Sequence, residues 1–138
     1  MLRSMFQVYV NGSGRAFEFY KKAFDAEVVY QPPYDKSLPI EDVWYDHSEL
    51  NVYGQILAVS EAKMLDHPNY ENATPLVHGN NVQLCLNFNR DEADKVRKAF
   101  EVLSEDAINP GTLDSGDYSP CIFCLTDKFG VSWCLFTE

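Results

Sequence analysis

The chain has 138 residues, enough for one domain to bury a hydrophobic core without disulfides. Hydrophobic residues make up 46% of the chain and aromatic residues 14%, which favours a packed globule over disorder. The formal net charge of −10 disfavours nucleic acid and anionic membrane faces as partners, because both repel a negative surface. The charge is compatible with a neutral or cationic small ligand, although its simplest effect is to keep the protein soluble.

From the sequence we expect neither a signal peptide nor a membrane span. No apolar run approaches the ~20 residues of a membrane span, and the N-terminal stretch lacks the apolar region of a signal peptide. The four cysteines lie in strand-like apolar surroundings without metal-finger spacing. We therefore expect a cytoplasmic protein with free thiols.

The first part of the chain predicts one strand, one helix and three more strands. The strand is MFQVYV, and the helix after it is capped by Ser13 and has apolar residues at three- and four-residue spacing. Extended stretches follow at about 27–31, 42–50 and 55–60. The polar connection that comes next, about 62–80, holds Pro68, Pro75 and Gly79 and is interpreted as a loop.

The second part repeats the first with a shift of 76 residues, without a gap. The shift places Gln7 on Gln83 and Gly54 on Gly130, and it places KKAF on RKAF at the ends of the two helices. The second strand-helix pair is NVQLCLNF and a helix capped by Asn89, followed by extended stretches at 107–113, 119–126 and 131–137.

The predicted fold class is therefore α+β, with two tandem β-α-β-β-β modules. Module one covers about 1–62 and module two about 81–138, and together they form a single domain.

Alternation along the first and last strands of each module separates two faces of the sheet. One face is apolar throughout, which suits packing under the helices. The other face mixes polar and apolar side chains without strong charge: Met5, Gln7, Tyr9, Ile56, Ala58, Ser60, Asn81, Gln83, Cys85, Asn87, Ser132, Cys134 and Phe136. Such a mixture is typical of a small-molecule cavity, although a dimer contact or a second core layer would also account for it.

Four stretches carry a resemblance to a known family: NGSGRAFEFYKKAFDAEV, DHSELNVYGQILAVSEA, NNVQLCLNFNRDEADKVRKAF and DKFGVSWCLF. In these the chain resembles the vicinal-oxygen-chelate superfamily, which includes glyoxalase I, bleomycin-resistance proteins and extradiol dioxygenases. It is most similar to the PhnB-like group. One departure is Asp25 in place of glycine after the first helix, where a left-handed conformation is expected. The resemblance implies a curved mixed sheet around a cavity, often completed by a homodimer.

The resemblance also implies where a metal would bind. Metal-dependent members place one ligand on the first strand and one on the last strand of each module, which here gives Gln7, Ala58, Gln83 and Cys134. Two amides, an alanine and one thiol are poor ligands for a catalytic divalent metal, so we expect no metal cofactor. The alternative is Zn, bound by Cys134 and Cys85 with His47.

Other residues suggest acid–base or thiol chemistry. Tyr45, His47 and Glu49 share a face by alternation, so the imidazole and the carboxylate can form a general-base pair, although a purely structural histidine is more common. Cys134 is a candidate nucleophile only if a neighbour lowers its pKa.

The remaining histidines and cysteines are given structural interpretations. His67 and His78 are interpreted as surface residues of the connection, unless this loop forms a lid over the cavity. Cys121 and Cys124 have CxxC spacing, but on a strand they point to opposite faces, so we expect buried structural cysteines.

Three functional hypotheses remain. The first is a metal-independent protein that binds a small neutral or cationic molecule through Gln7, Tyr9, His47, Ala58, Gln83, Cys85 and Cys134. The second is a metal-dependent lyase, isomerase or dioxygenase of the same superfamily. The third is a metal-free pocket enzyme that uses His47 and Glu49, with Cys134 as nucleophile. The fold alone does not decide among them.

Overall fold

The computed structural model describes residues 1–64, 75–115 and 119–138. The chain forms two compact units, Met1–Val77 and His78–Glu138, and their boundary falls inside the predicted connection. Within the described ranges, none of the helices has the length and apolar character needed to cross a membrane.

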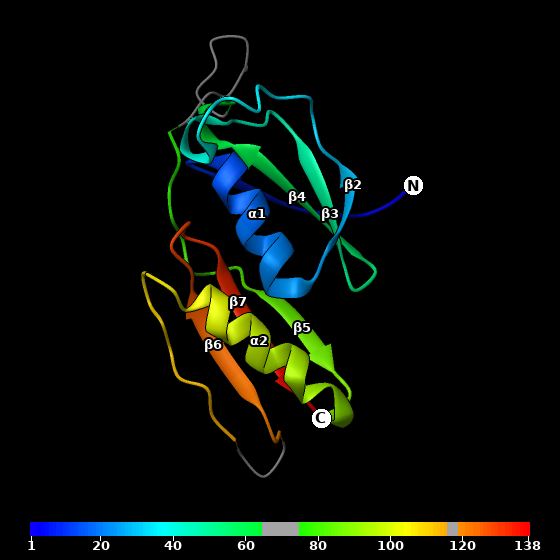
Figure 1. Ribbon diagram of the computed structural model, residues 1–138. Coiled ribbons are helices and arrows are strands. Elements are labelled where there is room, and N and C mark those ends of the chain that lie inside the picture. The colour runs from blue at the N-terminus through cyan, green and yellow to red at the C-terminus, as the bar shows by residue number, and fades with distance from the viewer. Residues whose placement is uncertain (65–74, 116–118) are drawn as a thin grey trace. The chain divides into compact units, whose positions relative to one another are not determined.

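The first unit has the predicted β-α-β-β-β order (Figure 1). Its elements are β1 (Phe6–Val10), α1 (Ser13–Phe24), β2 (Glu27–Tyr30), β3 (Ser48–Val52) and β4 (Gln55–Glu61), with short 3₁₀ turns η1 (Ile40–Asp42) and η2 (Ala62–Met64). The sheet order is β1-β4-β3-β2, in which β1 runs parallel to β4 and the other pairs are antiparallel.

The strand predicted at 42–50 begins only at Ser48. Pro39 starts a 3₁₀ turn in its place, and the N–H groups of Asp42 and Val43 donate back to the carbonyl oxygens of Pro39 and Ile40 at 2.9 and 3.2 Å. Because these two N–H groups donate within the turn, they cannot donate to a neighbouring strand, and β3 starts later than predicted.

The two helices start differently from one another. Asn89 forms a capping box with Glu92, as its predicted role requires, and the 3₁₀ turn η3 (Arg90–Glu92) leads into α2 (Ala93–Leu103). Ser13 is the first residue of α1 and makes no capping bond to its own helix; its hydroxyl accepts the N–H of Tyr45 at 2.7 Å. At the other end of α1, Asp25 has the expected left-handed conformation, with φ of 46°.

The second unit contains β5 (Leu84–Phe88), α2, β6 (Ile122–Thr126) and β7 (Ser132–Thr137), in the sheet order β5-β7-β6. The strand predicted at 107–113 is wrong: this segment meets β6 only at two isolated bridges, Asn109 with Thr126 and Asp114 with Ile122. Between them, Pro110 has no N–H to donate and Gly111 has a left-handed φ of 59°, so a continuous ladder cannot form.

The apolar face predicted from alternation packs under the helices. Four of its residues are at most 2% exposed: Leu57 and Val59 of β4, and Trp133 and Leu135 of β7. In Figure 1, α1 crosses the sheet of its own unit, and α2 crosses its own. Phe6 and Val82 are exceptions, since both are exposed, and Val82 lies before the start of β5.

Candidate functional site

The mixed face of the first unit carries a row of three side chains at one register. Gln7 of β1 pairs with Ala58 of β4, and Ala58 in turn pairs with Glu49 of β3. Paired residues in adjacent strands place their side chains on the same face, so this row crosses the sheet from β1 to β3. Two of the residues predicted to lie at metal-ligand positions, Gln7 and Ala58, are therefore neighbours.

Glu49 is almost completely buried and is the centre of the charged groups on this face. Both of its carboxylate oxygens accept from the Arg3 guanidinium, at 2.7 and 2.6 Å, and one also lies 2.8 Å from His47 Nε2. Its pKa is lowered, chiefly by the hydrogen bonds from Arg3 and next by the one from His47. The ring of Tyr30 stacks near His47, with centroids 6.3 Å apart. The predicted pairing of His47 with Glu49 is thus present.

Arg3 was not among the residues singled out from the sequence. It lies before β1 and is 46 positions from Glu49, so no local pattern connects the two. The only signal was a lone basic residue in an apolar, strand-like N-terminal stretch.

The Gln7 amide is fixed by its neighbours. Its Nε2 donates to the Tyr9 hydroxyl and to the Ser60 hydroxyl, both at 3.1 Å. Both hydrogens of the nitrogen are thereby used, which orients the carbonyl end of the amide. Gln7 itself is exposed, so the oriented amide is accessible on the surface of β1.

The second unit has an equivalent row made only of cysteines. Cys85 of β5 pairs with Cys134 of β7, and Cys134 pairs with Cys124 of β6. The repeat aligns Ala58 with Cys134 and Gln7 with Gln83. The residue that pairs with Cys134 is however Cys85, so Cys85 and not Gln83 takes the place that Gln7 has beside Ala58. The register of β5 is thus shifted by two residues from that of the gap-free repeat. Gln83 precedes β5, and its Nε2 donates to the carbonyl oxygen of Trp133 at 3.2 Å.

Cys134 is held in its thiol form. Burial raises its pKa to about 12, together with contacts to Cys124 and Cys85 that act in the same direction. A thiol of that kind is a poor nucleophile near neutral pH, since only the thiolate attacks. The geometry therefore supports the interpretation of Cys134 as a neutral thiol and not as a nucleophile activated for attack on a substrate.

Cys121 and Cys124 differ in burial. Cys121 is buried at 2% exposure, whereas Cys124 is exposed, so the expectation of two buried cysteines is wrong for Cys124. The exposed position follows from alternation along β6, because Cys124 lies on the face opposite to buried Phe123 and Leu125.

The residues at the metal-ligand positions do not fit a catalytic divalent metal. Ala58 has no donor atom, Gln7 offers only a neutral amide oxygen, and Cys134 keeps its proton. Glu49, the carboxylate beside them, is already bound by Arg3 and His47. In the part of the chain that the structure describes, no group of three or more His, Cys, Asp or Glu residues is arranged to hold a metal ion.

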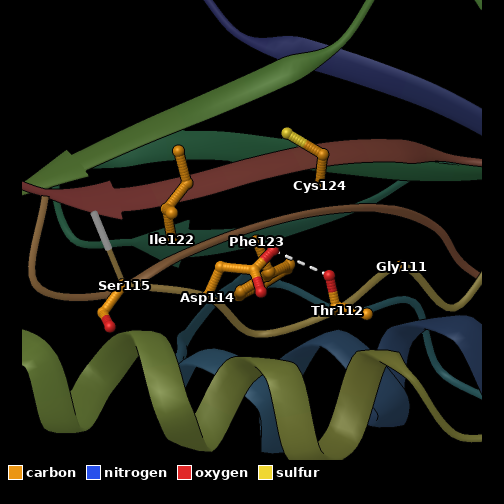
Figure 2. A pocket seen from close by; sticks show the side chains of 7 residues that line it. All are labelled: Gly111, Thr112, Asp114, Ser115, Ile122, Phe123 and Cys124. Atoms are coloured by element: carbon orange, nitrogen blue, oxygen red, sulfur yellow. Dashed lines mark hydrogen bonds between the residues drawn. The ribbon is translucent and has the colours of Figure 1, made fainter.

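A separate open pocket of about 440 Å³ lies where the segment 111–115 leaves the edge of β6 (Figure 2). Thr112 donates to Asp114 at 2.7 Å within it, and Phe123 and Cys124 of β6 line it with their side chains on opposite sides of the strand. Sequence reasoning did not indicate this pocket, because 107–113 was expected to be a paired strand.

His78 is the other histidine that the structure describes. His78 is exposed, and its ring lies against Gly130, where a Cβ would come within 2.7 Å of the imidazole. His67 lies outside the described residues.

Comparison with solved structures identifies the fold. A protein of Pseudomonas aeruginosa, PA1353, superposes with a TM-score of 0.71 at 21% identity, covering 100% of this chain and 98% of the other. A PhnB protein from Bacillus cereus gives 0.66 at 23% identity and full coverage of both chains. The fosfomycin resistance protein FosX of Listeria monocytogenes gives 0.63 at 11% identity, covering 100% and 93%.

The chain has the α+β fold of these glyoxalase/bleomycin-resistance-like neighbours. No family model matches the chain, and no curated protein matches it by sequence. At identities below 25% these likenesses establish the fold alone, and the activity has to be argued from the side chains.

Proposed function

We propose that this protein is a member of the vicinal-oxygen-chelate superfamily that binds a small neutral or cationic molecule on the mixed face of its sheets, without a catalytic metal. The observation that carries the proposal is the row from Gln7 through Ala58 to Glu49. The row and its neighbours offer an oriented amide, an imidazole and tyrosine rings in place of metal ligands, and Arg3 balances the buried carboxylate of Glu49. Polar groups fixed in this way give a ligand hydrogen bonds at little further cost in entropy.

The net charge supports the choice of ligand class. A protein with a formal charge of −10 repels anions at long range. On the mixed face of the first unit, the described cation Arg3 is already bound to Glu49, so it offers an anion little compensation. Neutral and cationic compounds meet no such barrier. The proposal includes a homodimer in a reducing, cytoplasmic compartment, which sedimentation of the 15.8 kDa chain and cell fractionation would each measure.

A thermal-shift screen of neutral, cationic and anionic compounds, followed by calorimetry on the hits, tests the proposal. Gln7→Ala should weaken the binding of a hit about tenfold, the equivalent of ~1.4 kcal/mol. Gln55→Ala is the matched control, because Gln55 lies in β4 with the opposite parity to Ala58 and should leave binding unchanged. A chelator should not alter the affinity; loss of binding with EDTA, or a stoichiometric metal in the purified protein, would overturn the metal-free assignment.

A second candidate is a metal-free acid–base enzyme, favoured by the 2.8 Å contact between His47 and Glu49. The lowered pKa of Glu49 makes the carboxylate the group that orients the imidazole, and leaves His47 as the base. The side chain of His47 is 38% exposed and can reach a substrate. Turnover of a bound compound that is abolished by His47→Gln, with binding retained, would establish this function over simple binding.

A further inference from the structure

Three thiols stand side by side across the sheet of the second unit, one on each strand. Cys85, Cys134 and Cys124 occupy paired positions of β5, β7 and β6 and therefore share a face. The outer two are exposed and the middle one is half-buried. Cys121, the fourth cysteine, is buried just before β6 and is not part of this row.

Hydrogen bonds at both ends of the β6–β7 pair show which kind of pair Cys124 and Cys134 form. The N–H of Asp127 donates to Val131 O at 2.9 Å, and the N–H of Thr137 donates to Cys121 O at 3.0 Å. Hydrogen-bonded pairs alternate with non-hydrogen-bonded pairs in an antiparallel ladder. Since Cys121 and Asp127 form backbone hydrogen bonds with the β7 side, the odd-numbered residues between them occupy the hydrogen-bonded positions, and the even-numbered residues occupy the others. Cys124 therefore faces Cys134 at a non-hydrogen-bonded position.

Hydrogen bonds at the outer edge of β6 independently show that Cys124 and Cys134 form a non-hydrogen-bonded pair. Ile122 and Thr126 donate their N–H groups away from β7, to the carbonyl oxygens of Asp114 and Asn109 at 2.9 and 2.8 Å. Cys124 has the same parity as these two residues. Paired Cα atoms at such positions are about 4.5 Å apart, within the range of roughly 4.4–6.8 Å over which a disulfide can close.

We propose that Cys124 and Cys134 are a site of reversible disulfide formation whose oxidant is a low-molecular-weight disulfide such as oxidised glutathione, and that Cys85 is the exchange thiol. In the first step the Cys124 thiolate attacks one sulfur of the oxidant, the S–S bond breaks, and one small thiolate leaves with the electron pair. In the second step Cys134 gives its proton to water and attacks Cys124 Sγ, and the second small thiolate leaves. Two protein thiols are oxidised and one small disulfide is reduced to two thiols.

Exposure and charge set the order of these steps. Cys124 is accessible to an oxidant, whereas burial and the neighbouring thiols keep Cys134 protonated. Once Cys124 is in a mixed disulfide it no longer carries a negative charge, so one of the contributions that raise the pKa of Cys134 disappears. Capping Cys124 therefore favours the second step.

Cys85 gives the disulfide a second partner. It lies beside Cys134 on the other neighbouring strand, so its thiolate can attack Cys134 Sγ and release Cys124. One disulfide is conserved in this exchange, and one of the three thiols is always free. The site thus has two oxidised forms that differ in which strand is linked to β7.

Peptide mapping tests the proposal on the wild-type protein. After incubation with oxidised glutathione the mass of the intact protein should fall by about 2 Da, and alkylation under denaturing conditions should then find two free thiols in place of four. Trypsin cuts after Lys98 and Lys128, so the product should link peptide 99–128 to peptide 129–138. Dithiothreitol should reverse the change.

Variants assign the link to individual residues. Cys121→Ala should oxidise as the wild type does, and Cys134→Ser should stop at a mixed disulfide. Cys124→Ser should move the link to peptides 64–90 and 129–138, because Cys85 then supplies the partner. The disulfide proposal is overturned if wild-type protein keeps four thiols, or if its link is lost in Cys121→Ala. The exchange role of Cys85 is overturned if Cys124→Ser forms no internal link.

Discussion

Glu61, at the end of β4, closes the start of helix α1 by binding Ser13. Its carboxylate accepts the backbone N–H groups of Gly12 and Ser13, at 3.1 Å each, and also contacts the Ser13 hydroxyl at 3.4 Å. A carboxylate at this position satisfies free N–H groups of the first turn and interacts favourably with the helix dipole. The capping group expected from Ser13 is thus supplied by a residue 48 positions away in the sequence.

Replacing Glu61 with alanine should therefore destabilise the first unit. The loss of the carboxylate that accepts two backbone N–H groups, and of its charge at the helix start, is expected to lower the free energy of unfolding by about 2 kcal/mol. Urea denaturation measures this loss. Glu18→Ala, on the exposed side of the same helix, should change stability by less than ~0.5 kcal/mol, and an equal loss in the two variants would contradict the capping role.

Gly111 allows a second prediction, because it passes directly over the backbone of Cys124. A Cβ at Gly111 would lie 2.0 Å from the Cys124 carbonyl oxygen, and its φ of 59° is left-handed. Gly111→Ala should therefore push the segment 111–115 away from β6 and cost about 3 kcal/mol or more.

Gly54→Ala is the matched control for that change. Its φ of 93° is also left-handed, but no described atom lies within 4 Å of the added Cβ, so only backbone strain of ~1–2 kcal/mol is expected. Thermal unfolding of the two variants separates the cost of backbone strain from the cost of the contact with the Cys124 carbonyl oxygen. Equal destabilisation would show that the contact with Cys124 carries no cost.

Alternation and the repeat predicted most of the fold, because alternation depends only on local periodicity and the repeat transfers the element order of one module to the other. They placed Leu57, Val59, Trp133 and Leu135 on the helix side correctly. The same reasoning failed at the register of β5, where a gap-free repeat aligned Gln83 with Gln7 and the sheet instead pairs Cys85 with Cys134. A register shift of two residues leaves every side chain of β5 on the same face of the sheet, so the hydrophobic pattern of the strand does not distinguish the two registers.

The cysteine row could have been found in the sequence. Folding β6 and β7 around the turn at Asp127–Gly130 as a hairpin places Cys124 opposite Cys134 directly. The contact between Arg3 and Glu49 could not have been found, since it joins a terminal segment to an interior strand with no shared pattern.

The pair of Arg3 and Glu49 predicts how stability depends on pH. The pKa of Glu49 is lowered in the folded state, so the stabilisation is complete above the ordinary glutamate pKa of about 4.3 and is lost as pH falls through the lower folded value. Arg3→Gln removes the largest cause of the shift. It should lower stability at pH 7, and its difference from wild type should shrink below about pH 4.

Urea denaturation at pH 7, 5 and 3.5 measures that dependence. Arg97→Gln removes an exposed ion pair with Asp94 and should have little effect at any of these values. A difference between Arg3→Gln and wild type that stays constant from pH 7 to 3.5 would mean that the Glu49 charge is not responsible.

The pKa of Cys134, raised to about 12, predicts slow alkylation. At pH 8 its thiolate fraction is lower than that of an ordinary thiol by roughly three orders of magnitude, and iodoacetamide reacts only with the thiolate. Labelling of peptide 129–138, which holds no other cysteine, should be correspondingly slower than labelling of N-acetylcysteine. The rate should rise about tenfold per pH unit from pH 7 to 9, because the thiol stays almost fully protonated over this range. A rate that levels off by pH 9 would show that Cys134 has an ordinary pKa, and would restore it as a candidate nucleophile.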